Sequence, residues 1–183
     1  MIDNSALIRR FVPEVNDGDS FIYTEFIDRV RGYTFPTVFF HRSRGEFDNQ
    51  LSEMRVLCEA LRLRAYTRLS TKSFKKVGVL FTEMVVQRAL SGEFGMMKRL
   101  YASALGRSSP VKKYWLFDVD NREESALEGE LSASGKLVCV IPSRAGRHLI
   151  TMPFDGRELQ KRHPGVDLQR DNPTNLFIPD LAT

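Results

Sequence analysis

The sequence predicts an α+β protein: a mostly antiparallel sheet with helices packed mainly on one face of it. Segments rich in aromatic and β-branched residues, several of them alternating apolar with polar positions, recur along the chain and indicate strands. Other segments place apolar residues at helical spacings. The 183 residues, 42% hydrophobic and 27% charged, fit one globular domain with an N-terminal half over 1–110 and a motif-bearing half over 111–183.

The N-terminal half is predicted to alternate strands and helices. The segment SFIYTEFIDRV is aromatic and β-branched, and TVFFHRSRG runs from an apolar strand into a basic turn. A helix is expected to begin after Ser70 or Ser73 and to end at Ser91-Gly92. The predicted strands are 20–30, 37–45 and 61–69, and the predicted helices are 46–60, 73–90 and 93–105.

The C-terminal half begins with the clearest strand signal, VKKYWLFDVD (111–120). Trp115, Phe117 and Val119 are expected to face the core. Asp155, with Glu158 three residues later, resembles a helix capping box. The predicted elements are a helix-prone stretch at 121–135, strands at 136–142 and 147–154, a helix at 155–162, and short strands in GVDLQ and NLFIP.

Charge and hydropathy narrow the class of protein. The net charge of +4 and the pI of about 9.2 suit an anionic partner such as a nucleotide or nucleic acid. No apolar stretch reaches the roughly 20 residues that span a bilayer, and the first residues lack a signal-peptide pattern, so a cytoplasmic protein without membrane contact is expected. Cys58 and Cys139 fall in apolar patterns and are expected to be buried.

Two carboxylates end the predicted strand 111–120. Asp118 and Asp120 share one face, because alternate side chains of a strand point to the same side. Their mutual repulsion would be relieved by Mg²⁺ or Mn²⁺, and Mg²⁺ commonly takes one or two protein carboxylates together with substrate phosphates. The alternative is an ordinary turn, since Asp and Asn favour turns.

A second polar group, Ser143-Arg144-Ala145-Gly146-Arg147-His148, follows about 25 residues later between two predicted strands. Guanidinium groups suit phosphate oxygens, and an imidazole could hold another. The alternative is a solvated hairpin tip. Adjacent strands of an antiparallel sheet can bring this hairpin beside the acid pair.

Together, FDVD (117–120) and SRAGRH (143–148) resemble the catalytic core of the archaeo-eukaryotic primase–polymerase superfamily. The resemblance implies that Asp118 and Asp120 bind metal, that Ser143 and His148 contact the incoming nucleotide, and that a third acid completes the metal site. Asp155, Asp167 and Asp171 are the candidates for this third acid, and Asp167, in a predicted strand, is the one we choose.

More loosely, the whole chain resembles small uncharacterised proteins of phages and bacteria. The similarity lies in RAYTRLSTKSFKKV, in the PSRAGRHLIT hairpin and in the ending DNPTNLFIP. This likeness implies a phage or prophage origin.

A basic strand face offers a further candidate interface. Arg64, Tyr66 and Arg68 alternate along 61–69 and would suit nucleic acid, with arginines on phosphates and the ring stacking on a base. A solvated sheet face is the alternative. Lys72 adds charge nearby, and the turn containing His41 is expected to be solvated.

The leading hypothesis is therefore a metal-dependent nucleotidyl transferase, or an inactive relative, that acts on a nucleotide and on single-stranded nucleic acid or a primer–template. Asp118, Asp120 and His148 would be catalytic, and Ser143, Arg144, Arg147 and His148 would bind the triphosphate. The alternative is a non-catalytic module that binds nucleic acid or protein. The sequence lacks P-loop, CxxC, HExxH and GxSxG patterns, which disfavours Walker-type NTPases, zinc hydrolases and serine hydrolases.

Overall fold

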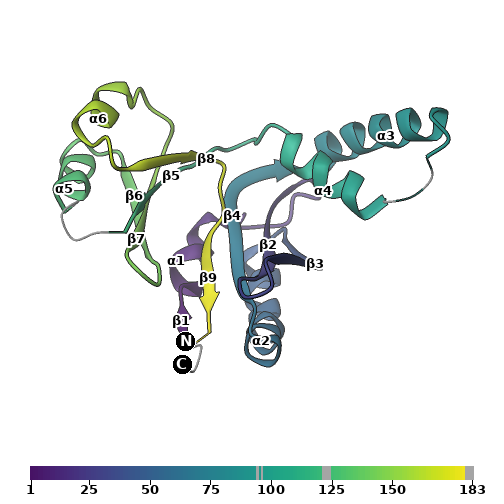
Figure 1. The fold of residues 1–183 in the computed structure, drawn as a ribbon, viewed down its shortest axis with the longest axis horizontal. Coiled ribbons are helices and arrows are strands. Elements are labelled where there is room, and N and C mark those ends of the chain that lie inside the picture. Colours follow the sequence, from purple (N-terminus) through teal and green to yellow (C-terminus); the bar gives the residue numbers. More distant parts are fainter. Residues whose placement is uncertain (94, 96, 121–124, 180–183) are drawn as a thin grey trace.

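The protein folds as an α+β structure with two antiparallel sheets (Figure 1). The computed structural model describes residues 1–93, 95, 97–120 and 125–179. The strands are β1 (Ile2–Asp3), β2 (Ser20–Asp28), β3 (Tyr33–His41), β4 (Arg64–Ser73), β5 (Trp115–Val119), β6 (Leu137–Pro142), β7 (Arg147–Thr151), β8 (Asp167–Arg170) and β9 (Thr174–Ile178). The helices are α1 (Ser5–Ile8), the 3₁₀ helix η1 (Arg9–Phe11), α2 (Arg44–Leu61), α3 (Phe74–Leu90), α4 (Met97–Arg107), α5 (Ser125–Ala133) and α6 (Arg157–Arg162).

The strands divide between two sheets, where the sequence predicted one. Sheet 1 has the order β1-β9-β4-β2-β3, and sheet 2 has the order β6-β7-β5-β8. Sheet 2 is built from a continuous piece of chain, after which β9 returns to the middle of sheet 1 (Figure 1). This return brings residues near the C-terminus between the two sheets, beside the motif-bearing strands.

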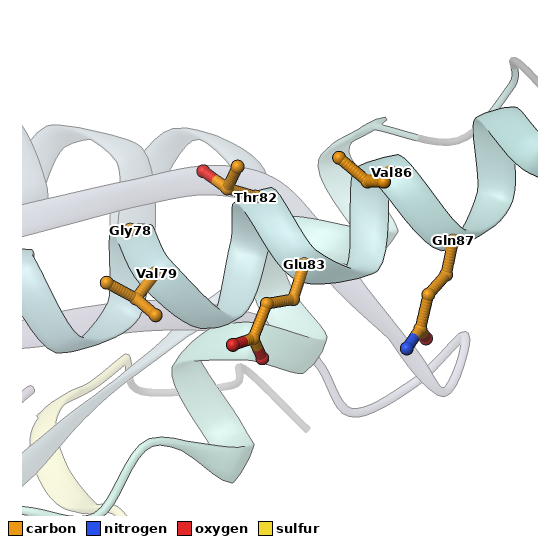
Figure 2. Close-up of a pocket in the computed structure, with 6 residues that line it drawn as sticks. All are labelled: Gly78, Val79, Thr82, Glu83, Val86 and Gln87. Atoms are coloured by element: carbon orange, nitrogen blue, oxygen red, sulfur yellow. The ribbon is translucent and has the colours of Figure 1, made fainter.

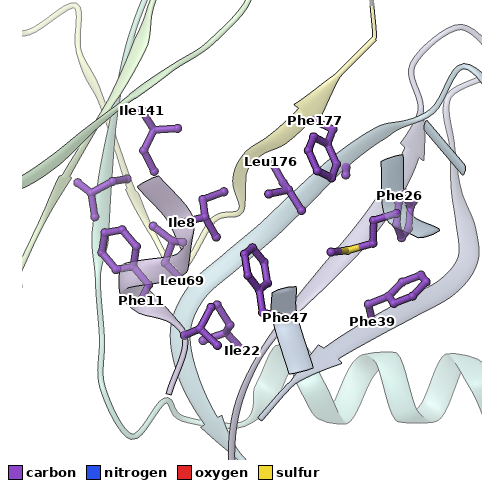
Figure 3. Close-up of a cluster of buried hydrophobic side chains, with 14 of the residues drawn as sticks. Ile8, Phe11, Ile22, Phe26, Phe39, Phe47, Leu69, Ile141, Leu176 and Phe177 are labelled. Atoms are coloured by element: carbon purple, nitrogen blue, oxygen red, sulfur yellow. The ribbon is translucent and has the colours of Figure 1, made fainter. Parts of the chain in front are cut away.

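One apolar cluster joins both sheets. Ile8, Phe47 and Phe177 from the sheet 1 side pack in the same cluster as Leu116 and Ile141 from sheet 2 (Figure 3). Asn4, which is buried, strengthens the junction: its Nδ2 atom donates to the backbone oxygens of Asn175 in β9 and Pro142 in β6, both at 2.9 Å. The relative position of the sheets is therefore held by apolar packing and by a two-pronged hydrogen bond.

Helices cover the remaining faces. On the outer face of sheet 2, α5 and α6 contribute Leu127 and Leu159 to a cluster with Phe117 and Val119. On sheet 1, α3 and α4 pack over Phe21 and Tyr23. Helices are thus distributed over several faces, whereas the sequence predicted them mainly on one.

Local sequence explains where two long helices begin. The Ser43 hydroxyl accepts from the Glu46 N–H at the start of α2, and the Ser73 hydroxyl accepts from the Lys76 N–H at the start of α3, both at 3.2 Å. Both are standard N-caps. Ser73 was one of the two caps expected from the sequence, and the structure selects it.

Several expectations about single residues are wrong. His41 is fully buried, whereas the sequence predicted a solvated turn, and Lys72 is fully buried as well. Lys72 is tolerated because its Nζ atom donates to the Ser108 carbonyl at 2.7 Å and pairs with Asp171 at 2.9 Å. Trp115 is half-buried beneath Arg170 and does not join the core.

Candidate active site

A polar pocket of about 460 Å³ lies between the two sheets, and we call it the inter-sheet pocket. Sheet 2 contributes Asp118 of β5, Asp120 just beyond its end, and the turn between β6 and β7, while sheet 1 contributes residues near the ends of its strands on the opposite wall. The lining residues are Ile27, Arg29, Arg64, Tyr66, Asp118, Asp120, Ser143, Arg144, Ala145, His148, Gln169, Asn172, Pro173 and Asn175.

The antiparallel register of sheet 2 brings the acids and the imidazole together. Asp118 in β5 is the pairing partner of His148 in β7 and of Asp167 in β8. The Nε2 atom of His148 lies 3.4 Å from Oδ1 of Asp118. Neighbouring positions of paired strands share a face, so all three side chains start from the same side of sheet 2.

His148 is held by β9. Its Nδ1 atom is 2.8 Å from the hydroxyl of Thr174, and both residues are buried. Burial lowers the pKa of His148, while the charges of Asp118 and Asp120 oppose that shift. The imidazole is therefore favoured in its neutral form, with Nε2 directed towards the acids.

The acids repel one another. Burial raises the pKa of Asp118, and the charges of Asp120 and Asp167 raise it further, against the opposing effect of His148. A cation placed among these carboxylates would remove this penalty. The donors are hard oxygens, which Mg²⁺ and Mn²⁺ prefer.

Among its described residues, the structure does not place a third acid in this donor set. Asp167 is adjacent in register, but its Oδ2 atom accepts from Gln169 at 2.7 Å and it does not line the inter-sheet pocket. Within the described ranges, no group of three or more His, Cys, Asp or Glu side chains is positioned to hold a metal ion. Asp118 and Asp120 would fit Mg²⁺ as a two-carboxylate set completed by waters and phosphates.

The other two candidates for the third acid are occupied elsewhere. Asp155 forms an exposed pair with Arg157 at 2.6 Å, which lowers the pKa of the Asp155 carboxyl. Asp171 pairs with the buried ammonium of Lys72. Neither lines the inter-sheet pocket.

A close backbone approach fixes the turn between β6 and β7. A Cβ atom on Gly146 would lie 1.9 Å from the carbonyl oxygen of Val119 and 2.8 Å from Cα of Asp120. The Gly146 N–H donates to the Ser143 hydroxyl at 3.0 Å. Glycine therefore lets the turn rest directly on the end of β5, which places Ser143 and Arg144 beside the acids.

The predicted phosphate ligands separate into two groups. Ser143, Arg144 and His148 line the inter-sheet pocket, as the sequence suggested. Arg147 does not, because it alternates with His148 along β7 and pairs with Glu128 of α5 at 2.7 Å. Its guanidinium belongs to the outer side of sheet 2.

The predicted nucleic-acid face of β4 is only partly available. Arg64 and Tyr66 line the inter-sheet pocket. Tyr66 is buried, its hydroxyl accepts from Nε of Arg29 at 3.1 Å, and the Arg29 guanidinium lies over its ring. Arg68 is paired with Glu25 and donates to the Asp171 carbonyl, so neither Tyr66 nor Arg68 is a free contact.

Sequence reasoning missed one wall of the pocket. Arg29, Gln169, Asn172 and Asn175 line it, and Thr174 orients His148. The DNPTN segment gave a signal, since Asn and Pro mark a turn where polar side chains can gather. No sequence signal pointed to Arg29, because nothing in the sequence connects the end of β2 with β5.

A second hollow, of about 610 Å³, follows the outer side of α3 (Figure 2). It is lined by Gly78, Val79, Thr82, Glu83, Val86 and Gln87. Glu83 is its single ionisable group, and the opposite face of α3 is the one that packs on sheet 1. This hollow lacks the converging polar groups of the inter-sheet pocket.

Comparisons of the chain with protein-family models, with curated proteins and with solved structures each found no match. The resemblance to the primase–polymerase superfamily therefore depends on the quoted residues alone. No helix in the described part of the chain is long and apolar enough to cross a bilayer.

Proposed function

We propose that the inter-sheet pocket binds a nucleoside triphosphate with Mg²⁺ or Mn²⁺ and transfers its nucleotidyl group, in the manner of a primase–polymerase-like enzyme of the cytoplasm. One observation carries the proposal: two acids, a buried imidazole and three guanidinium groups, those of Arg29, Arg64 and Arg144, line one pocket between two sheets. Cationic and acidic groups are both needed where a metal-bound polyphosphate is held.

Each set of side chains has a role in this proposal. Asp118 and Asp120 would hold the cation, which neutralises phosphate charge and stabilises the attacking and leaving oxygens. Arg144, at the exposed turn, would contact phosphate oxygens, and Nε2 of His148 would donate to another. Arg64 and Arg29 extend the cationic wall towards the nucleic-acid strand.

The protonation state of His148 supports this role. With Nδ1 held by Thr174, Nε2 can carry the proton and point into the pocket. Such a neutral donor can bind a phosphate oxygen without strongly repelling the nearby cation. Its orientation is fixed by a buried contact, so little ordering is needed on binding.

The direct test replaces both acids. Asp118→Asn combined with Asp120→Asn should weaken Mn²⁺-dependent binding of a nucleoside triphosphate by about a hundredfold or more, since even outer-shell changes cost about 10- to 100-fold. Calorimetric titration with Mn²⁺ and the nucleotide measures the loss, and thermal unfolding checks the fold. Asp155→Asn, at an exposed acid outside the pocket, is the matched control and should bind as the parent does.

Equal binding by the double variant and the parent would refute the proposal. The second candidate is an inactive relative that binds nucleotide without transferring it, and the distance of Asp167 from the pocket lining favours it. A primer-extension assay separates the two candidates: incorporation of nucleotide that is lost in the double variant indicates transfer, and binding without incorporation indicates the inactive relative.

A further inference from the structure

A separate aromatic pocket of about 250 Å³ lies on the outer face of sheet 2, and we call it the outer pocket. Trp115 of β5 and Phe154 form its aromatic part, with ring centroids 5.9 Å apart. The outer pocket is also lined by Leu168 and Arg170 of β8 and by Arg157 of α6. Half-buried aromatic rings open to a pocket provide a surface on which a planar group can stack.

Cations surround these rings. The guanidinium of Arg170 lies 5.1 Å from the Trp115 ring, and the ammonium of Lys136 lies 4.5 Å from the Phe154 ring. Both side chains belong to exposed residues, and within the described residues neither forms an ion pair with an acid. Arg157 differs, because Asp155 neutralises it at 2.6 Å. Asp155 also lines the outer pocket and interacts with Lys136, but the cations outnumber this acid, so the outer pocket carries a net positive charge beside an aromatic surface.

Trp115 also has an unused polar group. Its Nε1 atom is covered, and it has no hydrogen-bond partner among the residues that the structure describes. Covered indole N–H groups usually find an acceptor. A ligand that brought a hydrogen-bond acceptor to this atom would satisfy it.

The outer pocket and the inter-sheet pocket share two strands, β5 and β8, and use opposite faces of them. In β8, Gln169 lines the inter-sheet pocket, whereas its neighbours Leu168 and Arg170 line the outer pocket. β8 is the edge strand of sheet 2, so a bound strand could pass round this edge from one face to the other. Trp115 pairs with Arg170, and Asp118 lies three positions further along β5, about 10 Å away.

We propose that the outer pocket binds one unpaired base of single-stranded nucleic acid. The base would stack against Trp115 and Phe154, and Arg170 and Lys136 would contact the phosphates on either side of it. Stacking on aromatic rings beside a basic groove is how many proteins bind single strands, and a paired base within a duplex would not reach such a pocket. A strand bound here could pass over β8 into the inter-sheet pocket.

The single tryptophan of the chain makes the test direct. A short oligothymidylate, titrated in EDTA so that no metal site contributes, should quench the Trp115 fluorescence and saturate. An oligonucleotide of the same length with abasic sites should bind about 5- to 150-fold more weakly, the range expected for loss of one stacked base. Anisotropy of a labelled oligonucleotide should show the same loss for Trp115→Ala, and Trp115→Phe should retain part of the affinity if the alanine variant does not fold.

A charge-matched pair of variants tests the phosphate contact. Arg170→Ala should lower the salt dependence of binding by about 0.7 in the slope of log K against log salt, the value for one lost phosphate contact on a single strand. Arg107→Ala removes the same charge from an exposed position at the end of α4 and should leave the slope unchanged.

Three results with oligonucleotides would overturn the proposal: binding with no change in Trp115 fluorescence, equal affinity for the abasic oligonucleotide, or equal slopes for the two arginine variants. Equal quenching by polyglutamate would instead identify a general site for polyanions or acidic proteins, and would also overturn it. If this proposal is wrong, the proposed metal-dependent binding by Asp118 and Asp120 still stands, because that binding is measured separately with Mn²⁺.

Discussion

Two turns of similar composition are put to opposite uses in this protein. The first, His41-Arg42-Ser43-Arg44-Gly45, joins β3 to α2, and the second, Ser143 to His148, joins β6 to β7. Both contain serine, arginine, glycine and histidine. The first turn is used for folding, whereas most of the second lines the inter-sheet pocket.

In the first turn the side chains of His41, Arg42 and Ser43 all have partners within the protein. Ser43 caps α2, and Arg42 pairs with Glu46 at 2.7 Å. The ring of His41 is buried, with Nε2 2.8 Å from the Thr24 hydroxyl and Nδ1 2.7 Å from Oε1 of Gln50. Burial lowers the pKa of His41 to about 4, so this histidine is neutral and enclosed.

In the second turn the partners are fewer and the neighbours are acids. His148 has one fixed partner, Thr174, and its other ring nitrogen faces Asp118. Arg144 is exposed and lines the pocket. The difference arises from the element that lies next to each turn. Helix α2 encloses the first turn, whereas the end of β5 presents two carboxylates to the second. Composition alone therefore does not identify a site, and the register of the neighbouring strand does.

Substitution of the two glycines should have opposite effects, which is the largest contrast we expect. Gly146→Ala should destabilise the protein by about 3 kcal/mol, because the new Cβ atom would overlap the backbone of Val119. Gly45→Ala should stabilise it by up to about 1 kcal/mol, because Gly45 is helical and has open space around it. Urea unfolding of both variants measures these changes.

The same pair of variants tests whether the glycine places the pocket. Gly146→Ala should also weaken nucleotide binding, whereas Gly45→Ala should not. If both alanine variants unfold at the same urea concentration as the parent, the second turn does not rest on β5 as described.

A smaller effect is expected from the pH dependence of His41. Its pKa in the folded protein, about 4, is below the usual 6.5, so the unfolded chain binds the proton first as the pH falls. Stability from this group is complete above about pH 6.5 and is lost towards pH 4, which amounts to about 2 kcal/mol between pH 7 and pH 5. His41→Gln should flatten the curve of unfolding free energy against pH over this range.

His148→Gln is the matched comparison for that experiment. It should change nucleotide affinity, whereas His41→Gln should leave nucleotide affinity as in the parent. Parallel pH curves for His41→Gln and the parent would show that His41 titrates normally in the folded state, contrary to its buried contacts with Thr24 and Gln50.

Much of the fold could be predicted because local patterns determine it. The alternation along 61–69 correctly predicted a strand, and Ala65, Thr67 and Leu69 form a buried face of β4. The split into two sheets could not be predicted, since it depends on β9 crossing back to β4 over a long sequence separation. Trp115 was misplaced because its apolar character is equally suited to a core position and to a pocket wall.

The candidate site was predictable where strand geometry applies. The shared face of Asp118 and Asp120, and the approach of His148, follow from side-chain alternation and antiparallel pairing. The same alternation places Arg147 on the face opposite to that of its neighbour His148, so its absence from the pocket was predictable as well. Arg29 and Asn175 lie outside such reasoning, because their place in the pocket is set by the packing of the two sheets.

The most direct measurement of the central claim is a crystal structure of the protein soaked with Mn²⁺ and a non-hydrolysable nucleoside triphosphate, with the anomalous signal used to locate the metal. The account predicts a Mn²⁺ peak between the carboxylates of Asp118 and Asp120, with phosphate oxygens within hydrogen-bonding distance of His148 and Arg144. Metal and triphosphate bound elsewhere, or an inter-sheet pocket that stays empty at saturating concentrations, would contradict it.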